Sequence, residues 1–253
     1  MIKVGSLINL LALGTSVLSY GSATAVNDNS TNTTLPVNFG LVLYPAFQAL
    51  DVFGPLDALN ILSLNYSINL HLLSTTLDPV STKVPSDLPV NKANSDFSES
   101  IVPTATFDNP PENLDVLIVP GGFGTHASDE VLAPRINFIR DTYPNLQYLI
   151  TVCTGSWLAA RAGVLDNRNA TSNKAEWAVR EGLGNNTNWI PHARWVQDGN
   201  VWTSSGVSAG LDVTFAWLEA VFGNETATNV AVILEYERHL NASEDPFADY
   251  WGL

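Results

Sequence analysis

Residues 145–165, NLQYLITVCTGSWLAARAGVL, combine the pattern of a buried strand with that of a helix, and a single cysteine separates the two. The apolar run 149–152 has β-branched residues at three of its four positions, which is typical of a short buried strand. The apolar residues from Trp157 to Leu165 predict a helix. We therefore predict a sharp strand-to-helix turn with Cys153 at the end of the strand.

Cys153 is expected to act as a nucleophile at this turn. Gly155 lets the backbone reverse where a Cβ atom would clash. The first N–H groups of the following helix carry partial positive charge, which favours the thiolate over the thiol. This is the arrangement of a nucleophile elbow, with sulfur in place of the usual serine oxygen. The alternative is a buried and inert cysteine, since free cysteines are among the most buried residues.

The composition limits the classes of function. The chain has 253 residues, a length that suits one α/β domain with a sizeable core. Its 11 lysines and arginines against 25 aspartates and glutamates give a net charge of −14. Such a chain repels phosphate backbones and anionic lipids, so we expect no binding to nucleic acid. One cysteine cannot form an intramolecular disulfide, so stability must come from the core.

The N-terminus has the features of a secretory signal peptide over residues 1–25. An early lysine supplies positive charge, residues 4–18 are mostly apolar, and residues 23–25 (ATA) form a small-x-small cleavage site. Glycines and polar residues interrupt the apolar run, so we expect no membrane span after cleavage. The polar stretch 26–36 predicts a disordered lead-in, and the folded domain is expected at 37–253.

Several N-x-S/T sequons support an exported protein, either secreted or held in a compartment of the secretory pathway. Each sequon alone is a weak motif, and only their number together with the leader carries weight. The candidate glycosylation sites are Asn29, Asn32, Asn65, Asn169, Asn185, Asn224 and Asn241.

Strand and helix patterns alternate along the rest of the chain. The predicted strands are 37–44, 68–74, 114–120, 149–152, 169–172 and 193–196, with a further one after Gly199. A first helix is predicted to start near Pro55. Further helices are predicted near 134–141 and over 157–165, 211–222 and 228–237. The stretch 78–113 is expected to hold a short hairpin at one edge. Alternation without internal repeats predicts a single α/β domain with a doubly wound, mostly parallel sheet and helices on both faces.

The glycine-rich turn 121–124 (GGFG) follows the strand expected at the centre of the sheet. Ligands of open α/β sheets bind at the carboxyl ends of the strands. We expect the N–H groups of Gly121, Gly122 and Phe123, together with that of Thr154, to form a pocket that stabilises negative charge on a bound substrate. The turn lacks the later glycine and lysine of a phosphate loop, so nucleotide binding is not expected.

Asp51 follows the first predicted strand and so belongs to the same edge of the sheet. One interpretation is an acid that caps a helix or lies in its first turn. The other is an acid that faces Cys153, where a neighbouring thiolate and the loss of water raise its pKa. In that case Asp51 is protonated, stabilises the thiolate and delivers the proton to a substrate, and the pair shares one proton.

The four histidines do not have the spacing of a metal site, and we predict neither a metal ion nor a cofactor. His126 follows the glycine-rich turn and can reach the mouth of the pocket. His71 lies in a predicted strand and is expected to be structural, whereas His192 and His239 are expected at the surface.

Four ordered and correctly spaced motifs make the chain resemble the ThiJ/PfpI family of the class I glutamine amidotransferase-like superfamily. The motifs are 119–122 (VPGG), 152–156 (VCTGS), 162–166 (AGVLD) and 170–172 (ATS). The resemblance covers about 37–238 and implies a flavodoxin-like domain, a small-molecule substrate and a homodimer. The segment 50–55 (LDVFGP) further resembles the isonitrile hydratase branch.

The resemblance to that branch implies that Asp51 pairs with Cys153 and that Thr154 helps to bind substrate. The implied reaction is hydration of an isonitrile to an N-substituted formamide. Sulfur attacks the terminal carbon, Asp51 supplies the proton, water hydrolyses the thioimidate, and Gly122 and Thr154 stabilise the developing charge. Many relatives have a histidine where this chain has Asn173, which argues against a triad of the amidotransferase or protease type.

Two alternatives stay open at this point. The first is a cofactor-free glyoxalase III or deglycase activity on 2-oxoaldehydes, which uses the same cysteine but usually requires a nearby histidine. The second is a non-catalytic redox-sensing or binding protein whose cysteine is oxidised in the exported compartment. The missing histidine favours the hydratase over the first alternative.

Overall fold

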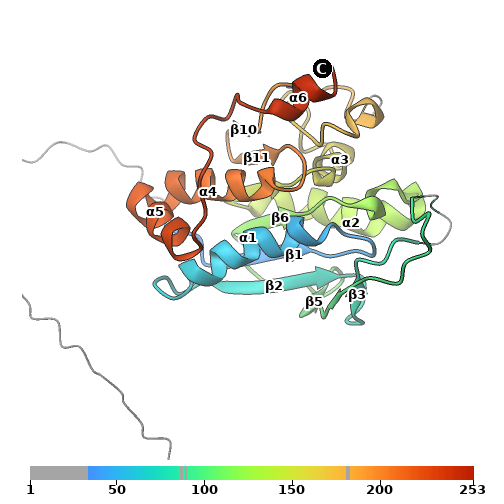
Figure 1. Cartoon of the computed structure of the whole chain (residues 1–253). Coiled ribbons are helices and arrows are strands. Elements are labelled where there is room, and N and C mark those ends of the chain that lie inside the picture. Colours follow the sequence, from blue (N-terminus) through green and yellow to red (C-terminus); the bar gives the residue numbers. More distant parts are fainter. Residues whose placement is uncertain (1–33, 86–87, 89, 181–182) are drawn as a thin grey trace, which may run out of the picture. The chain divides into compact units, whose positions relative to one another are not determined.

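A seven-stranded, mostly parallel sheet lies at the centre of the fold (Figure 1). The computed structural model of the protein describes residues 34–85, 88, 90–180 and 183–253. The predicted signal peptide lies outside these residues, as does most of the predicted lead-in. The strand order is β10-β11-β7-β6-β1-β2-β5, and among the described strands of this sheet only β10 runs antiparallel to its neighbour.

The central sheet contains β1 (Asn38–Val42), β2 (Asn69–Ser74), β5 (Ala105–Thr106), β6 (Val116–Val119), β7 (Tyr148–Thr151), β10 (Trp195–Asp198) and β11 (Val201–Ser204). Two small sheets pair β3 (Val80–Ser81) with β4 (Ser100–Ile101) and β8 (Asn169–Ala170) with β9 (Asn188–Trp189). The α-helices are α1 (Ala49–Leu62), α2 (Asp129–Thr142), α3 (Gly155–Arg161), α4 (Ala209–Phe222), α5 (Asn224–Ile233) and α6 (Pro246–Tyr250). The 3₁₀ helices are η1 (Phe123–His126), η2 (Tyr143–Asn145) and η3 (Trp177–Arg180). In the part of the chain that the structure covers, none of the helices combines the length and apolarity needed to cross a bilayer.

The middle strand β6 is buried along its whole length and pairs in parallel with β1 and β7. A strand covered on both faces has apolar residues at successive positions, as β6 does. Helix α1 packs against α4 and α5, whereas α2 packs against α3. The crossovers β1 to β2 and β6 to β7 run in opposite directions along the sheet, so right-handed connections place α1 and α2 on opposite faces. The predicted doubly wound fold, with its hairpin β3–β4 in the long connection, is confirmed.

The first helix starts earlier than the sequence predicts. Helix α1 begins at Ala49 with Gln48 at the N-cap, and Pro55 lies inside it. Pro55 has no N–H, so the carbonyl of Asp51 lacks its intrahelical donor. The side chain of Gln48 makes no capping hydrogen bond, so no capping residue marks the true start in the sequence. The predicted start near Pro55 is wrong, and Asp51 lies in the first helical turn.

The C-terminal helices also differ from the prediction. Helix α5 covers Asn224–Ile233 rather than 228–237, because Gly223, with a φ of 89°, separates it from α4. Helix α6 was not predicted, although Asp245 is a recognisable N-cap whose side chain accepts a hydrogen bond from the N–H of Phe247 at 3.1 Å.

A buried ion pair joins the segment before β10 to helix α4. The Nε atom of Arg194 donates to Oδ2 of Asp212 at 2.7 Å, and both side chains are buried. The hydroxyl of Tyr236 and Nδ1 of His239 contact the other carboxylate oxygen of Asp212. Because both charges are removed from water, each depends on the other for compensation.

The substitution Asp212→Ala should lower the free energy of unfolding by about 3–5 kcal/mol, because it leaves the charge of Arg194 buried without its main partner. Urea denaturation followed by circular dichroism measures the change. The control is Asp96→Ala, which removes an exposed ion pair with Lys83 and should leave the denaturation midpoint unchanged. Equal effects of the two substitutions would contradict this account.

Candidate active site

Cys153 occupies the predicted strand-to-helix turn. Strand β7 ends at Thr151, and α3 begins at Gly155. Cys153 has a φ of 58°, in the left-handed region that is unfavourable for residues with a Cβ atom. A Cβ atom on Gly155 would lie 2.1 Å from the carbonyl oxygen of Val119, so a side chain here would prevent the turn from packing on the end of β6. The nucleophile elbow is therefore present, and its strained backbone is typical of functional sites.

Asp51 lies against Cys153 rather than capping its own helix. Its side chain is fully buried, and the N-cap position belongs to Gln48. The N–H of Gly121 donates to Oδ2 of Asp51 at 2.9 Å. The carboxyl group and the Cys153 thiol are close enough for each to shift the pKa of the other, and Oδ1 of Asp51 has no hydrogen-bond partner among the described residues. Helix α1 thus brings the acid to the turn after β7, which carries the sulfur, and the turn after β6 orients the carboxyl group.

The Asp51 carboxyl and the Cys153 thiol together hold one proton at slightly alkaline pH. Burial raises the pKa of Asp51 from 3.8 to about 7, although hydrogen bonds from Gly121 and Cys153 oppose the rise. Burial, and next the charge of Asp51, raise the pKa of Cys153 from 9.0 to about 12. Groups this close titrate as a pair. The pair therefore keeps one shared proton above neutral pH.

Burial raises the pKa of the Cys153 thiol, whereas the sequence predicts that the elbow favours the thiolate. Helix α3 has only 7 residues, and Cys153 is only 5% exposed, so the lost hydration of a thiolate outweighs the field of the helix N-terminus. The ionised carboxylate of Asp51 adds repulsion. The pKa values of both groups are raised, which agrees with a pair that shares one proton, and the place of that proton within the pair stays a prediction.

Three further groups donate hydrogen bonds to the sulfur. The side-chain amide of Asn173 lies 3.1 Å from Sγ of Cys153, and the backbone N–H groups of Val207 and Thr154 also point at it. These donors lower the pKa of the thiol and can stabilise a thiolate when it forms. Sequence reasoning marked Asn173 only as a missing histidine. Val207 was not predicted, because it lies in a Ser/Gly-rich turn whose sequence gives no sign that a backbone N–H donates to the sulfur.

Two of the four N–H groups that the sequence predicts to stabilise negative charge on a substrate, those of Gly121 and Gly122, already have partners in the protein. The N–H of Gly121 is used by Asp51, and the N–H of Gly122 donates to Oγ1 of Thr154 at 3.0 Å. A Cβ atom on Gly121 would lie 2.6 Å from the backbone nitrogen of Thr154, so this residue must be small for the turn to pack here. The turn orients Asp51 and Thr154 instead of binding substrate through the N–H groups of Gly121 and Gly122. Phe123 contributes its side chain to the cavity wall.

A cavity of about 180 Å³ opens onto the sulfur. Its lining residues are Gln48, Gly122, Phe123, His126, Cys153, Thr154, Asn173, Ala175, Glu176 and Val207. His126 lies in this wall as predicted, with Nε2 3.9 Å from Oε2 of Glu176 and its ring against the edge of Trp157. None of the lining residues is a lysine or arginine. The cavity therefore suits a small, uncharged molecule better than an anion.

The remaining histidines lie away from this cavity. His71 is in β2, and His192 and His239 are largely exposed, although Nδ1 of His239 contacts Asp212. Across the residues that the structure describes, no three histidine, cysteine or acidic side chains are grouped to hold a metal ion.

The resting proton can be located with the variant Asp51→Asn. Its neutral amide removes the charge that raises the pKa of Cys153, so alkylation by iodoacetamide at pH 8 should accelerate, by about tenfold for each pKa unit removed. Mass spectrometry over a range of pH follows the reaction. The matched control Asp57→Asn alters an exposed acid of the same helix and should leave the rate unchanged. Slower alkylation of Asp51→Asn would show that a protonated Asp51 stabilises a resting thiolate.

This chain is similar to known proteins both in sequence and in structure. Residues 40–220 match the model of the DJ-1/PfpI family. The isonitrile hydratase of Pseudomonas putida is 33% identical over 205 residues, which are 80% of this chain and 79% of the relative. The crystal structure of a ThiJ/PfpI family protein from Pseudomonas syringae has a TM-score of 0.64 at 30% identity, over 86% of this chain and 83% of the other.

A regulator is also among the relatives. The HTH-type transcriptional regulator GbdR of Pseudomonas aeruginosa is 31% identical over 148 residues, which are 57% of this chain and 38% of the regulator. Similarity alone therefore does not choose between catalysis and regulation, and the choice depends on the site.

Proposed function

Because the chain belongs to the DJ-1/PfpI family, we propose that its buried Asp51–Cys153 pair hydrates an isonitrile to an N-substituted formamide. The observation that carries the proposal is the contact between the carboxyl and the thiol, which together hold one transferable proton. The similarity to an isonitrile hydratase over most of both chains supports the same reaction.

The pair holds the one proton that the first step requires. Asp51 takes the proton of the Cys153 thiol and passes it to the terminal carbon of the isonitrile, while the sulfur forms a bond to that same carbon. Both parts of the S–H group thus end on one carbon, and the product is a thioimidate, R–N=CH–S–Cys. One proton on the pair at the start is enough for this step.

Water completes the reaction. It adds to the C=N bond of the thioimidate, the nitrogen gains a proton, and the C–S bond then breaks to release R–NH–CHO. The leaving sulfur and the remaining proton restore the pair to its starting state. The net change is the addition of one water to the isonitrile, with no oxidant or cofactor.

The surroundings of the sulfur fit this sequence of steps. Donors from Asn173, Val207 and Thr154 stabilise negative charge on Sγ while the proton is on Asp51 or in transit. Among the described residues that line the cavity there is no lysine or arginine, and an isonitrile carries no net charge. Asn173 occupies the hydrogen-bonding position on the sulfur where a triad would need a base, and an amide cannot accept the thiol proton.

Two substitutions test the division of labour between acid and nucleophile. Cys153→Ala should abolish hydration of an aryl isonitrile, because no thioimidate can form. Asp51→Asn should lower kcat by about 10²–10⁴-fold, because it loses the group that moves the proton. Formamide production followed by liquid chromatography measures both, with Asp57→Asn as the control.

An Asp51→Asn variant that retains activity within threefold of the wild type would remove Asp51 from the mechanism. Methylglyoxal is assayed beside the isonitriles. Turnover of methylglyoxal with no turnover of isonitriles would replace the hydratase with the 2-oxoaldehyde activity. If the protein turns over neither substrate, and its mass increases at Cys153 after treatment with peroxide, a redox-sensing protein would be favoured.

We also propose that the protein is exported, on the basis of its N-terminal pattern and its sequons. The candidate asparagines within the described residues, Asn65, Asn169, Asn185, Asn224 and Asn241, are all exposed. Protein from the native host should begin near Val26 and gain gel mobility after enzymatic deglycosylation. Recovery of a full-length chain without glycans would contradict the proposal. The homodimer expected from the resemblance stays a prediction.

A further inference from the structure

A second cavity lies beside the one that opens onto the sulfur. It has a volume of about 220 Å³, and the two cavities share Asn173, Ala175 and Val207 as lining residues. On its other side the second cavity is lined by the aromatic rings of Phe247 and Trp251, each 50% exposed. The two cavities are therefore neighbours, and one of them has an aromatic wall.

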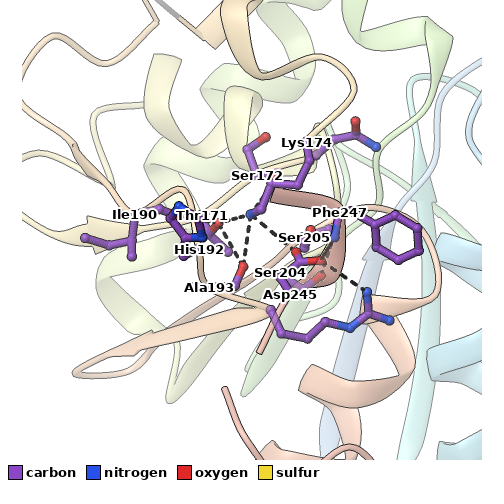
Figure 2. Close-up of polar contacts among 12 residues, drawn as sticks. Thr171, Ser172, Lys174, Ile190, His192, Ala193, Ser204, Ser205, Asp245 and Phe247 are labelled. Atoms are coloured by element: carbon purple, nitrogen blue, oxygen red, sulfur yellow. Dashed lines mark hydrogen bonds and ion pairs between the residues drawn. The ribbon is translucent and has the colours of Figure 1, made fainter. Parts of the chain in front are cut away.

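The aromatic wall is held in place by a buried ion pair. Nζ of Lys174 lies 3.6 Å from Oδ2 of Asp245, with both side chains buried, and Figure 2 shows them pointing toward one another. Oδ1 of Asp245 also accepts the N–H of Phe247, so the same carboxylate caps helix α6. Lys174 directly follows Asn173, whose amide contacts the sulfur. The position of the wall is thus tied to the position of the reacting group.

The ring of Phe247 is further oriented by a cation. Cζ of Arg194 lies over this ring at 5.9 Å from its centroid, and Arg194 is itself held by Asp212. Lys174 keeps its ammonium group away from the second cavity, because Nζ is bonded to Thr171 and to the carbonyl of Ala193 (Figure 2). The side chain of Lys174 is only 1% exposed, so its charge is held inside the protein and not presented to the cavity.

We propose that this second cavity is the subsite for a flat, aromatic N-substituent of the substrate. The inference rests on the proposed hydratase function. An isonitrile is linear at nitrogen, so a substituent must project directly away from the carbon that bonds to Sγ. A cavity of about 150 Å³ with apolar walls is enough to hold a benzene ring. This one is larger and has Phe247 and Trp251 on one side, with Ser205 and Ser208 among its other lining residues. Aromatic walls bind such rings through edge and face contacts.

Phenyl isonitrile and methyl isonitrile separate this subsite from the reaction itself. The substitution Trp251→Ala should lower kcat/KM for phenyl isonitrile about tenfold, mainly through KM, and leave methyl isonitrile within about twofold of the wild type. Phe247→Ala should act in the same direction, and Trp251→Phe should keep most of the preference. The control Phe97→Ala removes a ring that is 93% exposed and lines neither cavity.

Equal losses on both isonitriles, or no loss on phenyl isonitrile, would overturn the subsite. If the wild type hydrates neither compound, the proposed function fails, and binding then decides the subsite. Calorimetry would compare N-phenylformamide binding to Cys153→Ala with binding to the same protein carrying Trp251→Ala. Weaker binding to the second protein supports the subsite, whereas equal affinity or no binding to either overturns it.

Discussion

The contact between the Asp51 carboxyl and the Cys153 thiol is the interaction on which the site depends. It exists because the strand order β7-β6-β1 places the ends of three neighbouring strands side by side. Helix α1, after β1, brings Asp51, and the elbow after β7 brings Cys153. Gly121, after β6, orients the carboxyl through its N–H. Ligands of open α/β sheets bind at this edge, so one sheet order supplies the acid, the nucleophile and the group that orients the acid.

Removal of this pair from water decides which proton states it can adopt. A carboxylate and a thiolate ionised together would repel each other without solvent screening, so the pair keeps one proton over a wide range of pH. A resting thiol is also less reactive toward oxidants than a thiolate. The donors from Asn173, Val207 and Thr154 then allow charge to form on the sulfur when a substrate accepts the proton.

Membership of the DJ-1/PfpI family establishes the fold but not the reaction, because one fold carries many chemistries. The features that narrow the choice are particular to the surroundings of the sulfur. Asn173 donates to Sγ and cannot act as a base, and none of the described lining residues is a lysine or arginine. Helix α6 adds Phe247 and Trp251 beside that cavity and is anchored by a charge pair that is out of water.

The sequence by itself determined the order of strands and helices and the elbow at Cys153, because a buried strand followed by a helix is visible in a short window of residues. The expected position of Asp51 at the same edge of the sheet left its pairing with this cysteine as one of two interpretations, and resemblance to a family favoured it, since no local pattern joins the two segments. Only the tertiary structure decided that the N–H of Gly122 is already used by Thr154, that burial raises the pKa of the Cys153 thiol, and that Val207 donates a hydrogen bond to the sulfur. These properties depend on which segments meet and how completely they exclude water, and both are set by packing of the whole chain.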